Sequence, residues 1–421
     1  MGMTIAEKIV ARAGGLTKVV PGDLVTVDVS TVVMIDTNFY PSQWREIFKV
    51  KDPEKIVVIF DHRIPAPDRT VAKMHKIGRE LVKQFGIKRF HDVGAHQGIS
   101  HVIVSENAYA LPGTVLVCSD SHTASAGVMN CAARGLGYPD MIYAMTMGTT
   151  WFQVCPTIRY DIVGRLRPGV FTKDLFLHLA QHFGDHTNHN VEYGGPGIAT
   201  LNLNERRTLT TMGTEVNAEF SLFEPDDVLL DYVRGRTNKP FEAQYPDRDA
   251  QYAERRTLDL SKIEPLVARP DVIINNAVPV REVAGEPINQ AFIGSCANGS
   301  LDDFAAAARV LAGRHVAPGV RLLITPGSQE VYRNAIKAGY VATLAEAGAV
   351  ITNATCGACG GGHLGVLAPG ETCITASTRN FKGRMGDPSA RIYMASPATV
   401  AASAAAGVIS DASQFFAGEA V

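Results

Sequence analysis

The sequence predicts an α/β protein, in which short buried strands alternate with helices. Ile56-Val-Val-Ile-Phe60 and Thr114-Val-Leu-Val-Cys118 are short, apolar and rich in β-branched residues, as in parallel strands covered on both faces. Between them, residues 68–85 carry apolar side chains at helical spacing, and Gly86 ends that pattern. Because strands and helices alternate along the chain, we expect an α/β architecture.

The last third of the chain repeats this alternation. Residues 291–293 form a short apolar strand, residues 301–312 a helix and residues 321–325 another strand, after which a further helix is expected. The Ala-rich segment 398–406 has the composition of a close-packed helix, and Gly407 is placed to cap it.

Composition shifts along the chain predict three domains. The expected boundaries give residues 1–156, 157–287 and 288–421, each an α/β unit. The polar segment 234–256 lies in the second unit and is expected to be a surface excursion.

The overall composition excludes several classes of protein. The 421 residues are 46% hydrophobic and carry a formal charge of −2, so there is no basic field for nucleic acid. No apolar stretch reaches the roughly 18 residues that a membrane span needs. The start has no apolar signal core, and the seven cysteines show no disulfide framework. We therefore expect a cytoplasmic protein with reduced thiols.

Three cysteines carry the strongest chemical signal. Cys296 follows the strand at 291–293, and Cys356 and Cys359 form a Cys-x-x-Cys motif among glycines. Three thiolates could hold a cubane iron–sulfur cluster that keeps one iron open to a ligand. The spacing alone also fits a redox pair, or a structural zinc site completed by His363.

Polar residues follow two of the predicted strands. Asp61-His62 comes directly after the strand at 56–60, and Ser119-Asp-Ser-His-Thr123 follows the strand at 114–118. Open α/β sheets handle ligands at this end of their strands, and a carboxylate beside an imidazole can tune proton transfer. The alternative for the second motif is a helix cap, because Ser and Asp suit that position.

These motifs resemble the aconitase superfamily. Ile293-Gly-Ser-Cys-Ala-Asn-Gly299, the Cys-Gly-Ala-Cys motif at 356–359 and Thr378-Arg-Asn-Phe-Lys-Gly-Arg384 occur in the family's order and spacing. The resemblance covers essentially the whole chain and is closest to 3-isopropylmalate dehydratase large subunits. It implies domains 1–3 of the aconitase-like fold around a [4Fe–4S] cleft, without the mobile fourth (swivel) domain.

The same resemblance implies roles for individual residues. His101 lies nineteen residues before Asp120, the family's interval, and is chosen over His96 and His91, which we expect on a solvated loop. Glu215 falls on the family's catalytic-site glutamate, which partners a histidine. The implied catalytic residues are Asp61, His62, His101, Asp120, Ser121, His122 and Glu215, the substrate-binding residues are Arg379 and Arg384, and the metal ligands are Cys296, Cys356 and Cys359.

The implied cofactor is a [4Fe–4S] cluster with one labile, substrate-binding iron. The implied reaction is the dehydration and rehydration of a hydroxy di- or tricarboxylic acid. The first candidate is the isomerisation of 3-isopropylmalate and 2-isopropylmalate in leucine biosynthesis. In relatives the catalytic base is a serine of the mobile domain, so a separate small subunit is the expected partner.

Alternatives to this substrate stay open. The same chemistry would serve citraconate/2-methylmalate, dimethylmalate, homoaconitate or maleate. The chain departs from the family at Ile35, Thr211, Asn217, Ala297 and Thr355, and the loss of a histidine at Ile35 is the change we most expect to alter which acid is bound. A cluster-responsive RNA-binding regulator is a further alternative, which the lack of a basic stripe disfavours.

The remaining cysteines lie in apolar surroundings. Cys118, Cys131 and Cys155, and Cys373 in a strand-like segment, are expected to be core residues.

Overall fold

The computed structural model describes residues 2–418. The chain divides into two compact units, one of residues 1–163 and 186–258 (unit 1) and one of residues 164–185 and 259–421 (unit 2). The finer division into three domains at residues 156 and 287 stays a prediction.

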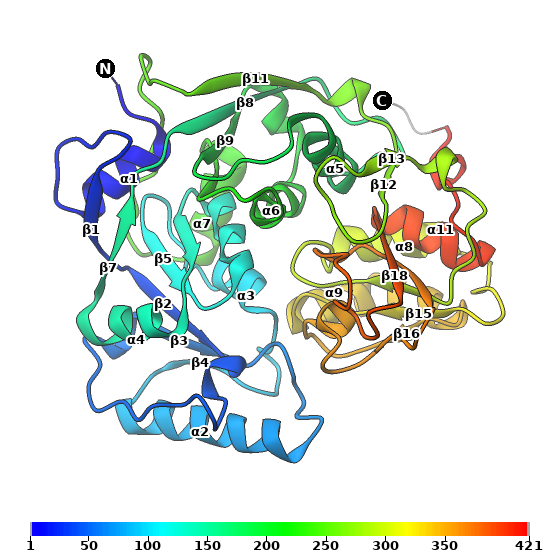
Figure 1. Cartoon of the computed structure of the whole chain (residues 1–421), viewed down its shortest axis with the longest axis horizontal. Helices are drawn as coiled ribbons and strands as arrows, with labels where there is room; N and C mark the ends of the chain where they lie inside the picture. The colour runs from blue at the N-terminus through cyan, green and yellow to red at the C-terminus, as the bar shows by residue number, and fades with distance from the viewer. Residues whose placement is uncertain (1, 419–421) are drawn as a thin grey trace. The chain divides into compact units, whose positions relative to one another are not determined.

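Unit 1 contains a five-stranded parallel sheet in the order β4-β3-β2-β5-β6 (Figure 1). Both strands predicted in this part of the chain, β3 and β5, are confirmed and fully buried. The strands are β2 (Thr31–Ile35), β3 (Ile56–Ile59), β4 (Arg89–His91), β5 (Val115–Cys118) and β6 (Ala132–Gly135).

The predicted helix between these strands is α2 (Arg69–Phe85). The side chain of Asp68 caps its first turn by accepting from the Val71 N–H at 2.9 Å, and Gly86 ends it with a left-handed φ of 63°. The other helices of unit 1 are α1 (Ile5–Ala13), α3 (Ser100–Glu106), α4 (Tyr138–Met147), α6 (Leu203–Met212) and α7 (Asp227–Arg236).

Unit 1 also holds two smaller sheets, one of four strands in the order β10-β9-β8-β11 and an antiparallel pair, β1-β7. Their strands are β1 (Leu24–Asp28), β7 (Thr149–Gln153), β8 (Thr157–Val163), β9 (Asn190–Gly194), β10 (Ser221–Phe223) and β11 (Glu254–Asp259).

Unit 2 is built on a seven-stranded mixed sheet in the order β13-β12-β18-β17-β14-β15-β16. Five strands run parallel, while β12 pairs antiparallel with both β13 and β18. The strands are β12 (Leu266–Ala268), β13 (Ala277–Pro279), β14 (Gln290–Ile293), β15 (Arg321–Ile324), β16 (Val350–Ile351), β17 (Thr372–Thr375) and β18 (Arg391–Ala395).

Helices α8 and α11 share one apolar core with this sheet. The predicted helices at 301–312 and 398–406 are confirmed as α8 and α11, and Gly407 caps α11 with a φ of 77°. The helices of unit 2 are α5 (Thr172–Phe183), α8 (Leu301–Leu311), α9 (Gln329–Lys337), α10 (Tyr340–Glu346) and α11 (Pro397–Ala406). Within residues 2–418, no helix is both long and apolar enough to cross a bilayer.

One local prediction is wrong. His91 is not on a solvated loop, because it lies buried in β4, where its ring contacts the His96 carbonyl at 2.8 Å and the Tyr109 hydroxyl at 3.1 Å. His96 is exposed as expected. The four cysteines predicted to be core residues, Cys118, Cys131, Cys155 and Cys373, are all buried.

Candidate active site

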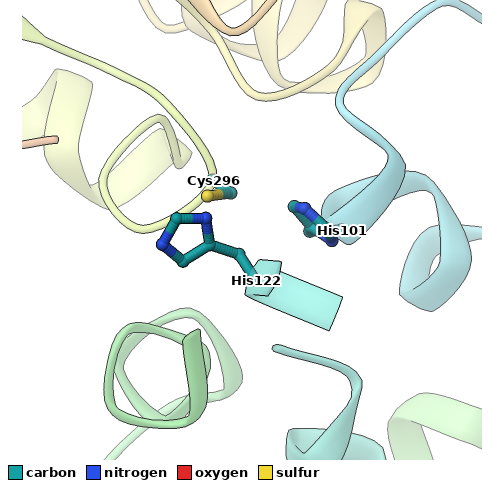
Figure 2. Close-up of side chains that lie close together, drawn as sticks. All are labelled: His101, His122 and Cys296. Carbon is teal, nitrogen blue, oxygen red and sulfur yellow. The ribbon is translucent and has the colours of Figure 1, made fainter. Parts of the chain in front are cut away.

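In unit 1, three histidines surround the carboxylate of Asp120. His101 Nε2 lies 2.9 Å from Oδ1, His62 Nε2 lies 3.2 Å from Oδ2, and the His122 N–H donates to Oδ1 at 2.7 Å. The rings of His101 and His122, drawn in Figure 2, have centroids 6.2 Å apart. Asp120 also caps the 3-10 helix that begins at Ser121, so the helix-cap interpretation of this motif is confirmed, and its catalytic role stays a prediction.

Further carboxylates hold two of these imidazoles. Asp61 Oδ1 lies 2.6 Å from His62 Nδ1, and Glu215 Oε1 lies 2.7 Å from His122 Nε2. Glu215 is buried, so it is not a solvated surface glutamate. We call this set, Asp61, His62, His101, Asp120, His122 and Glu215, the carboxylate–histidine network.

The strand ends of the sheet explain how these groups meet. Asp61 and Asp120 both follow parallel strands, β3 and β5, whose carboxyl ends lie at one edge of the sheet. Asp61 Oδ2 accepts from the Ser100 N–H at 2.9 Å, which fixes the start of α3 and thus the neighbouring His101. Only the fold brings Glu215 to His122, since 93 residues separate them.

The network sets the protonation of its members. Burial alone would lower the pKa of His62, but Asp61 and Asp120 raise it well above its usual value. Burial would raise the pKa of Asp120, but the three histidines around it hold it well below the usual range. The pKa of His122 is raised, against burial, by Asp120 and Glu215. Imidazolium donors beside an ionised carboxylate can therefore exist at neutral pH, and such donors serve as general acids.

In unit 2, the three cysteines lie on turns at the sheet. Cys296 follows β14 and is 6% exposed, Cys359 is 1% exposed, and Cys356 is half-buried. A hydrogen bond from Cys356 lowers the pKa of the Cys359 thiol well below its usual value, and Arg384 and Thr378 favour the thiolate against burial. Arg384 Nη2 lies 3.7 Å from Cys359 Sγ, and the Thr378 hydroxyl lies 3.6 Å from it.

The donor set, three cysteines beside a guanidinium, suits an iron–sulfur cluster, whose usual protein ligands are Cys thiolates. Within residues 2–418, no three ligand atoms within 4.8 Å of one another include Cys356 or Cys359, as one zinc ion would require, and His363 forms no such set with them. An added Cβ at Gly360 would meet only Arg384 Nη2, at 4.0 Å, so the turn leaves open space beside the guanidinium.

The other predicted site residues are placed as follows. Ser121 is exposed at the start of its 3-10 helix, and its carbonyl accepts from the Thr214 hydroxyl at 2.9 Å. Arg379 and Arg384 are partly exposed on the segment after β17. Arg384 contacts the cysteine centre (Cys296, Cys356 and Cys359) through Cys359, whereas the guanidinium of Arg379 stacks 5.9 Å from the Phe381 ring.

Sequence reasoning missed two residues of these sites. Asp36 is fully buried after β2, accepts from the N–H groups of His62 and Arg63, and thereby orients the Asp61-His62 turn. Its position directly after the apolar run at residues 32–35, which forms part of β2, was the available signal. Thr378 holds Cys359, which no pattern indicated. Ile35 packs in the core of the sheet.

Three cysteines and a carboxylate–histidine network on an α/β fold are the groups expected of an enzyme that binds a metal cluster. Comparison with known proteins defines the class further. The sequence profile described as "Aconitase family (aconitate hydratase)" matches residues 42–407. This chain belongs to the aconitase family. The predicted hydro-lyase class and aconitase-like α/β fold are confirmed, and the family implies a [4Fe–4S] cluster.

Full-length relatives are more specific. The 3-isopropylmalate dehydratase large subunit of Mycolicibacterium smegmatis is 52% identical over 98% of this chain and 97% of its own length. The corresponding large subunit 1 of Methanopyrus kandleri is 42% identical, over 98% and 99%. A protein named "Probable methanogen homoaconitase large subunit", of Methanothermobacter thermautotrophicus, is 39% identical over 97% of both chains. A solved structure of aconitase X from Thermococcus kodakaraensis aligns with a TM-score of 0.48 at 13% identity, over 84% of both chains.

Proposed function

We propose that this chain is the large catalytic subunit of a hydro-lyase that interconverts 3-isopropylmalate and 2-isopropylmalate, a step of leucine biosynthesis. The observation that carries the proposal is the full-length identity of 52% with a large subunit of that name. The carboxylate–histidine network and the cysteine centre supply the two kinds of group that such a reaction needs, a proton donor and a Lewis-acid site.

The network is proposed to handle the proton of the departing hydroxyl. His62 and His122 both have raised pKa values because carboxylates lie against them, so the charged form of each imidazole is favoured. Asp120 joins His62, His101 and the His122 backbone, so a proton given to the hydroxyl can be replaced from a neighbouring group. Ser121, exposed beside this network, is proposed to contact the substrate.

Cys296, Cys356 and Cys359 are proposed to hold the [4Fe–4S] cluster, with one iron labile because only three thiolates bind four irons. When bound, the cluster supplies a Lewis acid for a substrate carboxylate and hydroxyl. Arg379 and Arg384 present planar guanidinium forks that suit carboxylates. Arg384 also stabilises the Cys359 thiolate, so it is proposed to organise the site as well as bind substrate.

A small subunit is the proposed partner. The relatives most similar to this chain are named large subunits, which implies a separate small chain. The reaction also needs a base for the carbon-bound proton and a cover that excludes water. We propose that the small subunit supplies both.

Anaerobic reconstitution of the purified chain with iron and sulfide tests the proposal. We expect turnover of 3-isopropylmalate only when the cognate small subunit is added. Normal turnover by this chain alone would contradict the two-subunit arrangement. Binding of stoichiometric zinc without iron uptake would contradict the cluster.

Homoaconitate is the second candidate substrate, because a relative 39% identical over almost the full length carries a homoaconitase name. Parallel assays of 3-isopropylmalate, homoaconitate and citraconate with the assembled enzyme distinguish these acids. A kcat/KM for homoaconitate above that for 3-isopropylmalate would reverse the assignment.

A further inference from the structure

A fully buried lysine lies beneath the segment that carries the predicted carboxylate-binding residue Arg379. Lys173, on α5, is 0% exposed, and its Nζ donates to the Ser377 carbonyl at 3.0 Å. The carboxyl group of the neighbouring Asp174 does not extend to this segment, since it accepts from the N–H groups of Phe171 and Leu266.

The segment itself is tightly held at several points. The Ser377 N–H donates to the Thr375 hydroxyl at 3.0 Å, and Asn380 Nδ2 donates to the Arg269 carbonyl at 2.6 Å. Between these anchors, the hydroxyl of Thr378 contacts Cys359 Sγ. The Lys173 ammonium therefore binds the peptide group that directly precedes Thr378, one residue before Arg379.

A buried ammonium is costly, and a methionine of similar length would fill the same volume without a charge. Packing alone therefore does not account for a lysine here. A charge-assisted hydrogen bond is stronger than a neutral one, so it can hold a carbonyl in one orientation. It also places a positive charge near a site that, on the proposed function, contains three thiolates and binds an anionic acid.

We infer that Lys173 is a positioning residue: by fixing the Ser377 carbonyl, it holds Thr378 against Cys359 and aims Arg379 at a substrate carboxylate. The part of this inference that concerns the carboxylate rests on the proposed function. The part that concerns the segment does not.

Hydrogen–deuterium exchange of the purified full-length chain tests the segment directly. We expect the amides of residues 378–380 to exchange about 10-fold faster in Lys173→Met and in Lys173→Gln, because the shorter glutamine side chain does not reach Ser377. The amides of β15 should keep their protection. Asp174→Asn is the matched control, because it changes the adjacent buried group of α5 and should leave residues 378–380 protected.

The assembled enzyme provides a second measurement. Lys173→Met should raise the KM for the hydroxy acid by about 10-fold and change kcat far less, a division that a general loss of stability would not produce. If the wild-type enzyme dehydrates none of the tested acids, the proposed function fails while the exchange result still stands. Unchanged exchange at residues 378–380 in either folded variant, or failure of both variants to fold, would overturn the inference.

Discussion

The carboxylate–histidine network and the cysteine centre are organised in opposite ways. In the network, side chains hold one another: His62 lies 2.6 Å from Asp61, His122 lies 2.7 Å from Glu215, and His101 lies 2.9 Å from Asp120. In the cysteine centre, the conformation of the backbone largely positions the cysteines. In the network, side chains of this chain contact one another, whereas the cysteine centre is proposed to bind a cluster.

The backbone near the cysteine centre has several residues with positive φ values. Ser295, just before Cys296, has a left-handed φ of 71°, and its Oγ accepts from the Cys296 N–H at 2.6 Å. Gly357 and Gly361 also have positive φ values, 65° and 58°. A positive φ costs free energy at Ser295, where the surrounding structure must impose it, but not at the two glycines. We expect protonation states fixed by neighbouring groups to favour proton transfer, and a backbone conformation fixed before binding to favour binding of the cluster.

The largest expected effect removes the cluster. Cys296→Ser, Cys356→Ser and Cys359→Ser should each abolish [4Fe–4S] assembly, because a cubane held by three thiolates has no spare ligand. Iron and sulfide content and the EPR spectrum after reconstitution measure this. Cys131→Ser, at a thiol buried in the core, is the control and should assemble a normal cluster. A full cluster in any of the first three variants would refute the ligand assignment.

Asp120→Asn should abolish most turnover and leave the cluster intact, which separates the two regions. The substitution removes the negative charge of the Asp120 carboxylate, which all three histidines contact. General acid–base groups typically contribute about 100- to 10,000-fold in rate. Steady-state kcat of the assembled enzyme measures the effect. Asp92→Asn, which removes the carboxylate that pairs with Arg79 at 2.6 Å and accepts from the Val93 N–H, should leave kcat unchanged.

Gly357→Ala should destabilise the cysteine centre, and Gly360→Ala should not. An added Cβ at Gly357 would approach Thr325 Oγ1 to 2.7 Å at a left-handed φ, whereas at Gly360 it meets only Arg384 Nη2, at 4.0 Å. Strain of this kind costs about 1–3 kcal/mol. Thermal unfolding of both variants without iron gives the comparison. Equal melting temperatures would show that the turn accepts a Cβ at Gly357 without strain.

The smallest effect concerns pH and belongs to the network alone. The raised pKa values of His62 and His122 mean that the native state binds more protons than the unfolded chain above pH ~6.5. Their contribution to stability is thus fully present below that pH and is lost as pH rises through the folded pKa values. His62→Gln should flatten this decline in melting temperature by a few degrees. A decline as steep as in the wild-type chain would place its origin elsewhere.

The sequence by itself determined the local elements and the chemistry-bearing motifs. Helical spacing of apolar residues located α2, Ala-rich composition located α11, and β-branched runs located β3 and β5, because these signals depend on which neighbouring residues must be buried. The three cysteines and the Asp61-His62 and Asp120–His122 motifs could be selected because few other residue types perform their chemistry.

Only the tertiary structure decided which groups meet. Nothing local indicates that Glu215 holds His122 across 93 residues, or that Lys173 reaches Ser377 across 204. His91 shows the same limit, since its ring is held by the hydroxyl of the more distant Tyr109 as well as by the nearby His96 carbonyl. Hydrogen-bond partners of buried polar groups are chosen by the packing of distant elements, and sequence patterns report only on burial along one element.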